Sequence, residues 1–367
     1  MFDSEAQSQG WLPISYTQEK FPAKVMKDLL VPVAAERYRR LESDSGLSGA
    51  RIWHVIGKER EYCLRQWPRP HPSAEKLTEI HRCLIFARTH DVSIVPDVIL
   101  PGMGVPLCRA PSLGESFVEV GGVYWELLQW LPGTADFWSR PNSERLRSAC
   151  RSLGELHAVW RSMPWSATAN HADQRPAPAI AERLKLLVGL TPAVVGDLET
   201  ALRRFTDRAW FADCARILKE IGTLRPTLLS ELTYYSKSTY RCQHVMRDIW
   251  HDHVLFLGDT CSGLIDFGAL RIDTVATDLV RILGSLTKSA PSSKWQDGLC
   301  DYEKENKLAE IELAALGVLY RSSVLLAGVQ WVRWLTVDEL QFPGKETFVK
   351  HRLADLATEI QAIVDDK

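Results

Sequence analysis

The stretch RDIWHDHVLFLGDTCSGLIDFG, residues 247–268, constrains the fold of this chain more than any other feature of its sequence. Two short apolar runs, VLFL and GLI, are separated by the turn-like sequence GDTCS, which predicts a small β-hairpin. Two aspartates, Asp248 and Asp266, stand on either side of this hairpin. The fold must therefore place a hairpin, with a carboxylate at each end, in a half of the chain that is otherwise helical.

Helical patterns occupy most of the chain after residue 130. In SERLRSACRSLGELHAVWRSM, residues 143–163, buried-type side chains recur three and four positions apart, which predicts one amphipathic helix. Similar patterns continue to residue 240 and resume after the hairpin. The run KLAEIELAALGVLYRSSVLLAGVQWVRWL predicts one long helix or a bent pair of helices. In the helix predicted at residues 143–163, the side chains on the apolar face are Leu146, Cys150, Leu153, Leu156 and His157.

The N-terminal third has a different pattern, in which short strands alternate with turns. The runs RIWHV and EYCLRQW flank IGKER, whose glycine and charged residues suit a hairpin turn. The segment PSAEKLTEIHRCLIFARTH carries Leu77, Ile80, Leu84 and Ala87 at helical spacing, and GVYWELLQWLPG follows as an extended run. This part of the chain is therefore predicted to be a β-rich region with one helix.

The length of 367 residues is large for a single core, so we predict two lobes. The sequence Pro132-Gly133, which ends the last extended run, is a natural boundary. We therefore expect an α+β protein with an N-lobe at residues 1–130 and a helical C-lobe at residues 131–367 that includes the hairpin.

The composition is that of an ordinary globular protein, with 46% hydrophobic and 25% charged residues. A net charge of -2 gives no electrostatic reason to expect nucleic acid or an anionic membrane as a partner. No signal peptide is visible, and the uncharged apolar runs are shorter than the roughly 20 residues of a spanning helix, so we expect a cytoplasmic protein. The eight cysteines form no CxxC pair, which argues against a structural zinc site.

The hairpin and its flanks resemble the catalytic and metal loops of the aminoglycoside phosphotransferase and choline kinase-like family, small-molecule kinases with a protein-kinase-like fold. That family has H-G-D-x-x-x-x-N, then a strand, a turn, and I-D-F or I-D-W-G. Here the corresponding sequences are MRDIWHDH, which ends at His253, and LIDFG. The two aspartates are 18 positions apart, as in the family. The resemblance implies a bilobal fold with a small β-rich N-lobe and a larger, mainly helical C-lobe.

The resemblance also implies roles for the two aspartates. Asp248 would receive or orient the proton of the acceptor hydroxyl, and Asp266 would hold Mg²⁺ against the nucleotide phosphates, since Mg²⁺ prefers hard oxygen ligands. His253 occupies the position of the family's metal-binding asparagine. Three interpretations stay open: His253 is a metal ligand, Asp252 or a water takes that role, or the second metal site is lost. We favour His253 as a ligand that faces the nucleotide. Met246 replaces the family's first histidine.

The resemblance extends to the nucleotide site in the N-lobe. The segment SDSGLSGARIWHV is similar to the loop that covers the nucleotide, with Gly46, Ser48 and Gly49 approaching the phosphates. Arg65 stands where the family often has a phosphate-binding lysine. Glu79 is the acid predicted to pair with Arg65, and Glu75 is the alternative.

The run WELLQWLPG resembles the family's hinge, whose backbone binds the nucleotide base. Glu126 and Leu128 are the positions predicted to make this contact. Asp278, in ATDLVR, fits the structural acid that braces the catalytic loop. These residues complete the nucleotide site that the resemblance implies.

The predicted function is transfer of the γ-phosphoryl group of ATP or GTP, with Mg²⁺, to a hydroxyl of a small molecule. Candidate acceptors are an aminoglycoside, an amino alcohol, a sugar or a hydroxy amino acid, bound between Asp248 and the C-terminal helices. One alternative is a kinase-like nucleotide-binding or regulatory protein that has lost turnover, because Met246 and His253 depart from the family pattern. Another is a metal hydrolase built on His244, His251 and His253, since histidines bind transition metals.

Overall fold

The computed structural model describes residues 11–14, 21–41, 49–69, 71–109, 115–163 and 174–366. The chain divides into two compact units. Unit 1 comprises Met1–Asp136 and Asp252–Gly268, and unit 2 comprises Phe137–His251 and Ala269–Lys367. The predicted boundary near residue 130 lies close to Asp136, but the prediction placed the hairpin in the helical half, whereas it groups with the β-rich unit.

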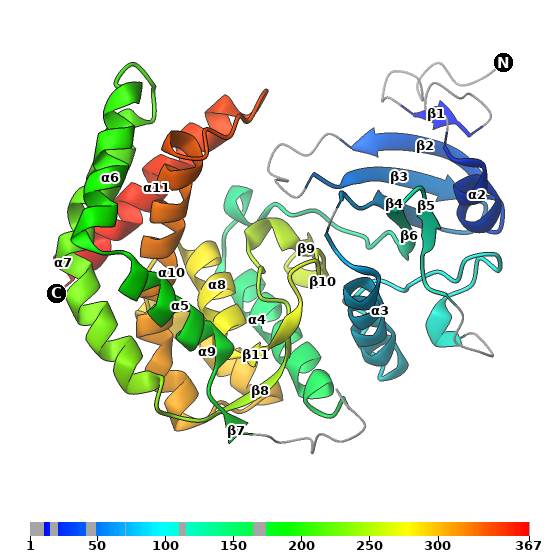
Figure 1. Ribbon diagram of the computed structural model, residues 1–367. Coiled ribbons are helices and arrows are strands. Elements are labelled where there is room, and N and C mark those ends of the chain that lie inside the picture. Colours follow the sequence, from blue (N-terminus) through cyan, green and yellow to red (C-terminus); the bar gives the residue numbers. More distant parts are fainter. Residues whose placement is uncertain are drawn as a thin grey trace. The chain divides into compact units, whose positions relative to one another are not determined.

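Unit 1 is built on a six-stranded antiparallel sheet in the order β1-β2-β3-β4-β6-β5 (Figure 1). The predicted strands around IGKER are confirmed as β3 and β4. In the pairing of β4 with β6, Arg65 stands directly opposite Glu126, so their side chains lie on the same face of the sheet. The strands are β1 (Leu12–Pro13), β2 (Ala35–Leu41), β3 (Arg51–Gly57), β4 (Glu61–Gln66), β5 (Val118–Val120) and β6 (Val123–Gln129).

The opposite face of this sheet carries an aromatic core. Trp53 and Trp125 stack with their ring centroids 5.4 Å apart, and Phe21 packs edge-on against both rings. Side chains alternate between the faces of a strand, so burying these rings leaves the neighbouring Ile52 and Glu126 on the other face. Two short helical segments, α2 (Ala23–Val25) and the π-helix η1 (Met26–Leu30), add buried residues to this core.

Helix α3 (Ala74–Thr89) is the single long helix among the described residues of unit 1. Ser73 caps its start, because the hydroxyl oxygen accepts the backbone N–H of Lys76 at 3.2 Å. The four predicted apolar residues are all buried, as the spacing indicated: Leu77, Ile80, Leu84 and Ala87.

The predicted hairpin is confirmed as β9 (Val254–Leu257) and β10 (Thr260–Leu264). Its backbone is bonded to the rest of unit 1, which explains why it does not belong to the helical unit. Phe256 and Thr134 exchange two N–H···O bonds of 3.0 and 3.1 Å, and Leu264 N donates to Ile94 O at 2.7 Å. The close approach needs a glycine at position 133, where φ is +109° and a Cβ would lie 2.7 Å from the Phe256 carbonyl oxygen.

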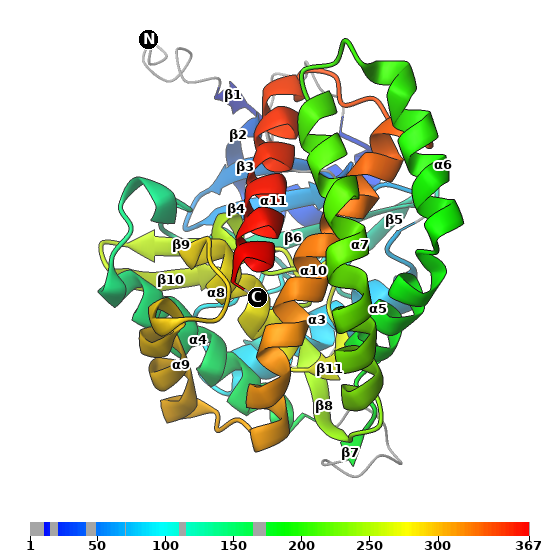
Figure 2. The ribbon, with the colours of Figure 1, turned by 90° about the vertical axis from the view of Figure 1, so that its left-hand side faces the viewer.

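Among its described residues, unit 2 has eight α-helices and a three-stranded antiparallel sheet, β11-β8-β7. In Figure 2, α7, α10 and α11 run side by side, and contacts between all three pairs agree with this view. The elements are α4 (Ser143–Arg161), β7 (Gln174–Arg175), α5 (Pro178–Gly189), α6 (Pro192–Leu202), α7 (Phe211–Tyr235), β8 (Tyr240–Val245), β11 (Arg271–Thr274), α8 (Ala276–Thr287), α9 (Ser293–Glu305), α10 (Glu310–Thr336) and α11 (Glu346–Asp365).

The predicted apolar stripe of α4 is buried along its length. It packs closely on α9, because a Cβ at Gly154 would lie 2.8 Å from the Tyr302 carbonyl oxygen and one at Gly298 would lie 2.8 Å from Cys150 Sγ. The sequence allowed one long helix or a bent pair near the C-terminus, and the structure has one, α10.

Helix α10 is also the one helix in the described ranges that is long and apolar enough, by length and composition alone, to cross a membrane. The prediction rested on uncharged apolar runs alone, and Arg321 interrupts the run in this helix. For that reason no segment of sufficient length was predicted. In the structure 56% of the apolar window is buried inside the protein, as in the core helix of a globular domain.

Candidate active site

A cavity of about 180 Å³ lies within unit 1. One end is charged, where Arg65, Glu126 and Asp266 meet. The rest is apolar and is formed by β3, α3, β6 and the segment after it, Leu255 of β9, and the segment that follows the hairpin. An apolar slot with a few convergent polar groups is typical of a small-molecule site. The apolar walls include Ile52, Leu84, Leu128, Leu131, Leu255, Ile265 and Phe267.

Arg65 organises the charged end. Its guanidinium lies 3.6 Å from both a Glu126 and an Asp266 carboxylate oxygen, and it covers the Trp67 ring at 4.7 Å from the centroid. Glu126 is 1% exposed, and its second oxygen is 2.5 Å from His81 Nε2 on α3. The acids nearby raise the pKa of Arg65 despite its burial, which by itself lowers the pKa, so the side chain is a fixed cation.

The predicted acid for Arg65 was Glu79, and here the prediction is wrong. Arg65 pairs with Glu126, while the Glu79 carboxylate binds Lys76 Nζ at 2.8 Å. The physical reason is the strand register, which places Glu126 directly across from Arg65. Glu126 therefore contributes a buried side chain where the hinge prediction concerned its backbone. Leu128, the other hinge position, lines the cavity as an apolar wall.

Asp266 lies at the mouth of the charged end with its side chain 42% exposed. Burial opposes its ionisation, but Arg65, His253 and the N–H of Gly268 outweigh that effect and lower the pKa of the carboxyl. His253 Nε2 is 3.6 Å from the Asp266 carboxylate. The two predicted metal ligands are therefore neighbours, and a carboxylate oxygen and an imidazole nitrogen are both groups that can bind a divalent cation.

The residues present fit a phosphate group as well. Trp67 Nε1 is a buried donor without a hydrogen-bond partner among the described residues, whereas Arg65 Nε faces a Glu126 carboxylate oxygen at 3.6 Å. A buried donor usually has an acceptor, so an anion at this end would satisfy Trp67 Nε1. Gly49, just before β3, has a φ of +71°, as a glycine turn requires. The predicted phosphate contacts Gly46 and Ser48 lie outside the described residues.

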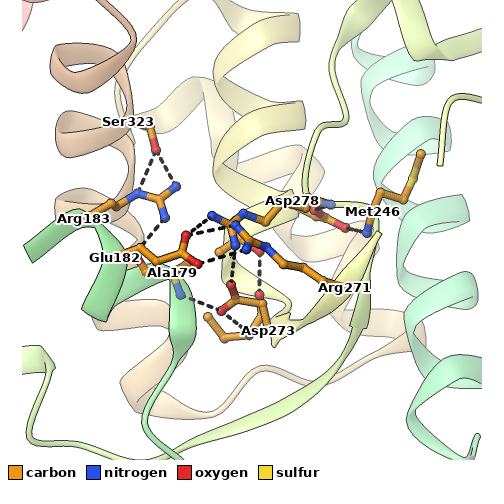
Figure 3. A network of polar contacts seen from close by, with 11 residues as sticks. Ala179, Glu182, Arg183, Met246, Arg271, Asp273, Asp278 and Ser323 are labelled. Atoms are coloured by element: carbon orange, nitrogen blue, oxygen red, sulfur yellow. Dashed lines mark hydrogen bonds and ion pairs between the residues drawn. The ribbon is translucent and has the colours of Figure 1, made fainter. Parts of the chain in front are cut away.

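In unit 2 the loop that carries Asp248 is held by Asp278. The backbone N–H groups of Met246 and Arg247 each donate to the Asp278 carboxylate at 2.7 Å, and Figure 3 shows the bond to Met246. His157 Nε2 lies 3.1 Å from the same carboxylate, and His157 Nδ1 lies 2.9 Å from the Tyr302 hydroxyl. The predicted bracing role of Asp278 is confirmed by these contacts.

A second network ties Arg247 to helix α5 through Glu182. Glu182, Arg271 and Asp273, which belong to this network, are labelled in Figure 3. Arg247 has a φ of +69° and donates to Asp273 at 3.1 Å and to Glu182 at 2.5 Å. Arg271 binds both oxygens of Glu182 at 2.9 Å. Asp273 also accepts the backbone N–H of Ala179 at 3.2 Å. The residue before Asp248 is thus fixed in a left-handed conformation by side chains from two other elements.

Asp248 itself is half exposed, and its carboxylate is contacted by Arg281 of α8. Arg281 also lines a cavity of about 90 Å³ that is formed wholly by unit 2. Helices α8, α10 and α11 and the side chain of Trp250 contribute to its walls. This is the region where an acceptor pocket was predicted. The charged residues of the lining are Arg281, Lys288, Arg352, Asp355 and Glu359.

The arrangement of histidines does not match the metal-hydrolase alternative. His251 Nδ1 lies 3.0 Å from the Ser285 hydroxyl, and its ring stacks on Trp138 at 3.6 Å. His244 is buried. Across the described ranges, no three histidine, cysteine or acidic side chains form a group that could hold a metal ion.

An antiparallel sheet with a buried arginine–glutamate pair, and a helical unit with an aspartate loop braced by a second aspartate, are consistent with a phosphotransferase of the protein-kinase-like class. The sequence comparison agrees. Residues 41–313 match the Phosphotransferase enzyme family, and the chain belongs to that family. The protein is a small-molecule kinase with a hydroxyl acceptor.

Individual relatives extend this result. The chain is 27% identical over 281 residues to the homoserine kinase of Methylorubrum populi, an alignment that spans 72% of this chain and 77% of that one. Two solved structures have a TM-score of 0.54 and 14% identity. They are an aminoglycoside phosphotransferase from Alicyclobacillus acidocaldarius (95% and 97% of the chains covered) and a microcompartment-associated aminopropanol kinase (90% and 92%). They confirm the predicted fold.

Proposed function

We propose that this protein transfers the γ-phosphoryl group of ATP or GTP to the hydroxyl of a small hydroxy amino acid, with homoserine as the first acceptor to test. The observation that carries the proposal is the cavity beside Arg281, which is small, about 90 Å³, and lined by side chains of both charges. A zwitterion needs both a cationic and an anionic partner, and this cavity offers both. The similarity to a homoserine kinase points to the same class of acceptor.

A polycationic antibiotic fits this cavity poorly. Its lining has three cations, Arg281, Lys288 and Arg352, against the two acids Asp355 and Glu359. An acceptor with several ammonium groups would be repelled, whereas a carboxylate would be attracted.

The nucleotide would bind in the cavity of unit 1. Its base would lie against the apolar walls, and Arg65 and Trp67 would donate to phosphate oxygens. A divalent cation held by Asp266 and His253 would neutralise charge on the β- and γ-phosphates. The unpartnered Trp67 Nε1, the Arg65 guanidinium beside it and the lowered pKa of Asp266 support this assignment.

The chemical step would use Asp248 as the base. Its carboxylate takes the proton of the acceptor hydroxyl as the oxygen forms a bond to the γ-phosphorus. The bond from that phosphorus to the bridging oxygen breaks, and the nucleoside diphosphate leaves with the electron pair. The Asp278 brace and the Arg247 network keep Asp248 in position for this step, and fixed geometry accounts for much of the rate gain in such reactions.

The second candidate function is nucleotide binding without turnover, which the replacement of the family's histidine by Met246 suggested. In the structure Met246 contributes its backbone N–H to Asp278. This contact does not depend on the side chain, so the loop is braced with methionine at this position. The observation favours the enzyme.

The test is an ADP-release assay with ATP, Mg²⁺ or Mn²⁺, and one acceptor at a time: L-homoserine, 3-amino-1-propanol, a sugar and kanamycin. We expect release with L-homoserine and its loss in Asp248→Asn. Thermal stabilisation by nucleotide without any acceptor-dependent release would instead support the binding protein.

A further inference from the structure

The contact between Arg281 and Asp248 is unusual for a catalytic carboxylate. Arg281 Nη2 donates to an Asp248 carboxylate oxygen, and this guanidinium also forms part of the wall of the small cavity in unit 2. The Arg281 side chain is 31% exposed and that of Asp248 is 48% exposed. A carboxylate that is paired with a cation is a weaker proton acceptor than an unpaired one. The base and the acceptor cavity are therefore linked through one side chain.

Arg281 stands among other cations. Burial and the nearby Arg183, Arg352 and Arg247 lower its pKa to about 9. Its Nε is buried and has no hydrogen-bond partner in the part of the chain that the structure describes, and the same is true of Arg352 Nε. Two guanidinium groups of one cavity thus each have an N–H donor without an acceptor. A carboxylate in addition to that of Asp248 would satisfy these donors.

We propose that Arg281 is an acceptor-operated latch: it holds Asp248 when the cavity is empty, and the carboxylate of the acceptor draws it away, which frees Asp248 to take the hydroxyl proton. The inference rests on the proposed function, since it concerns the same acceptor site. It assigns to Arg281 a positioning role and makes the carboxylate of the acceptor a requirement for turnover.

The cavity offers two guanidinium groups that can bind the acceptor carboxylate when Arg281 leaves Asp248. An arginine binds a carboxylate through two parallel N–H···O bonds, and Arg352 offers a second guanidinium in the same wall. Arg352 is positioned by the Trp250 ring, which it covers at 4.7 Å from the centroid. The acceptor carboxylate therefore replaces one anionic partner of Arg281 with another, so the guanidinium stays paired when it leaves Asp248.

The same cavity has a place for an ammonium group. Asp355 and Glu359 stand on α11 at the i and i+4 spacing that puts them on one face of the helix. The Tyr320 hydroxyl donates to Glu359 at 3.2 Å, and Lys288 Nζ lies 4.0 Å from Asp355. An amino alcohol would use these acids but would leave the latch closed, because it brings no anion to Arg281.

Three matched compounds test the latch. L-Homoserine has both charges, 4-hydroxybutanoate lacks the ammonium group, and 3-amino-1-propanol lacks the carboxylate. Binding of each is measured by calorimetry, and turnover by ADP release in the presence of ATP and Mg²⁺. The variants are Arg281→Met, the charge-conserving Arg281→Lys, and Lys288→Met, which removes a different cation from the same cavity.

In the wild type we expect both carboxylates to bind and 3-amino-1-propanol to be a poor substrate. Arg281→Met should weaken binding of both carboxylates by roughly 30-fold, the effect of removing one partner of a buried charge pair. The same variant should raise kcat for 3-amino-1-propanol above the wild-type value, because Arg281 no longer holds Asp248. Arg281→Lys keeps the positive charge but lacks the planar guanidinium. Its affinity for the carboxylates and its kcat for 3-amino-1-propanol should lie between those of the wild type and of Arg281→Met. Lys288→Met should not raise that kcat.

Retained thermal stabilisation by nucleotide shows that a variant is folded. If Arg281→Met keeps wild-type affinity for the carboxylates and wild-type kcat for 3-amino-1-propanol, the latch is refuted while the proposed function stands. If the wild type binds 4-hydroxybutanoate through Arg281 but phosphorylates none of the three compounds, the carboxylate site stands and the proposed function fails. Should Arg281→Met not fold, an unchanged Arg281→Lys variant would overturn the latch by the same measurements.

Discussion

Replacing Asp278 with asparagine should disable the loop that carries Asp248 without disturbing nucleotide binding. Asp278 is fully buried, and its two oxygens accept the N–H groups of Met246 and Arg247, both at 2.7 Å. Asparagine has nearly the same shape but only one acceptor oxygen. Its NH₂ group must therefore face either the N–H of Arg247, or the N–H of Met246 together with the ring nitrogen of His157.

The cost follows from the bonds that are lost. Hydrogen bonds to a charged group contribute about 1.5–3 kcal/mol each, and a buried donor without a partner costs a further 1–3 kcal/mol. Asp278→Asn removes the charge from both bonds and breaks one of them, so we expect the free energy of unfolding to fall by about 3 kcal/mol. Because the loop would no longer hold Asp248 in place, kcat should fall by about 100-fold.

The assay combines urea denaturation, ADP release and nucleotide titration, and the matched control is Asp301→Asn. Asp301 is also a buried acid of unit 2, but it binds Arg151 and Lys304 on the α4–α9 side. The control should lose stability while keeping kcat near the wild-type value. If Asp278→Asn is as stable and as active as the wild type, or if the control loses kcat to the same extent, the bracing argument is wrong.

The remaining predictions concern unit 1. His253→Asn should raise the ratio of activity with Mg²⁺ to activity with Mn²⁺ by about tenfold, because an amide oxygen is a harder ligand than an imidazole; an unchanged ratio would show that His253 is not a ligand. Glu126→Gln should weaken nucleotide binding more than Glu79→Gln, since Glu126 fixes Arg65 and Glu79 binds Lys76; equal effects in a nucleotide titration would contradict this. The pKa of Asp266 is lowered in the folded state, so its ionised carboxylate adds stability that is fully present above about pH 4 and is lost as pH falls through the lowered pKa. In Asp266→Asn, the free energy of unfolding, measured by urea titration, should therefore fall less steeply with decreasing pH below about pH 4 than in the wild type.

Local sequence patterns predicted much of this molecule. The turn GDTCS between two apolar runs predicted the hairpin, and the spacing of Leu77, Ile80, Leu84 and Ala87 predicted α3. Both follow from interactions between residues close in sequence, which turn chemistry and helical periodicity encode directly. The bracing by Asp278 came from the resemblance to a family, because the bonds to Met246 and Arg247 span 32 and 31 positions.

The features that were not predicted depend on tertiary geometry. The acid beside Arg65 is decided by the register of β4 against β6, and the sequence of α3 offered Glu75 and Glu79 with no means of choosing a strand residue instead. The hairpin joins unit 1 through backbone bonds to Thr134 and Ile94, which no side-chain pattern reveals. The contact of Arg281 with Asp248 exists because α8 brings a residue 33 positions away onto the loop.

The central claim is tested most directly by ³¹P NMR of the protein with ATP, Mg²⁺ and L-homoserine. The account predicts a new phosphomonoester signal that grows as the γ-phosphate signal declines in equal amount, and no such signal with Asp248→Asn. Nucleotide binding by both proteins, with no phosphorylated product from L-homoserine or any other hydroxyl acceptor in the panel, would contradict it.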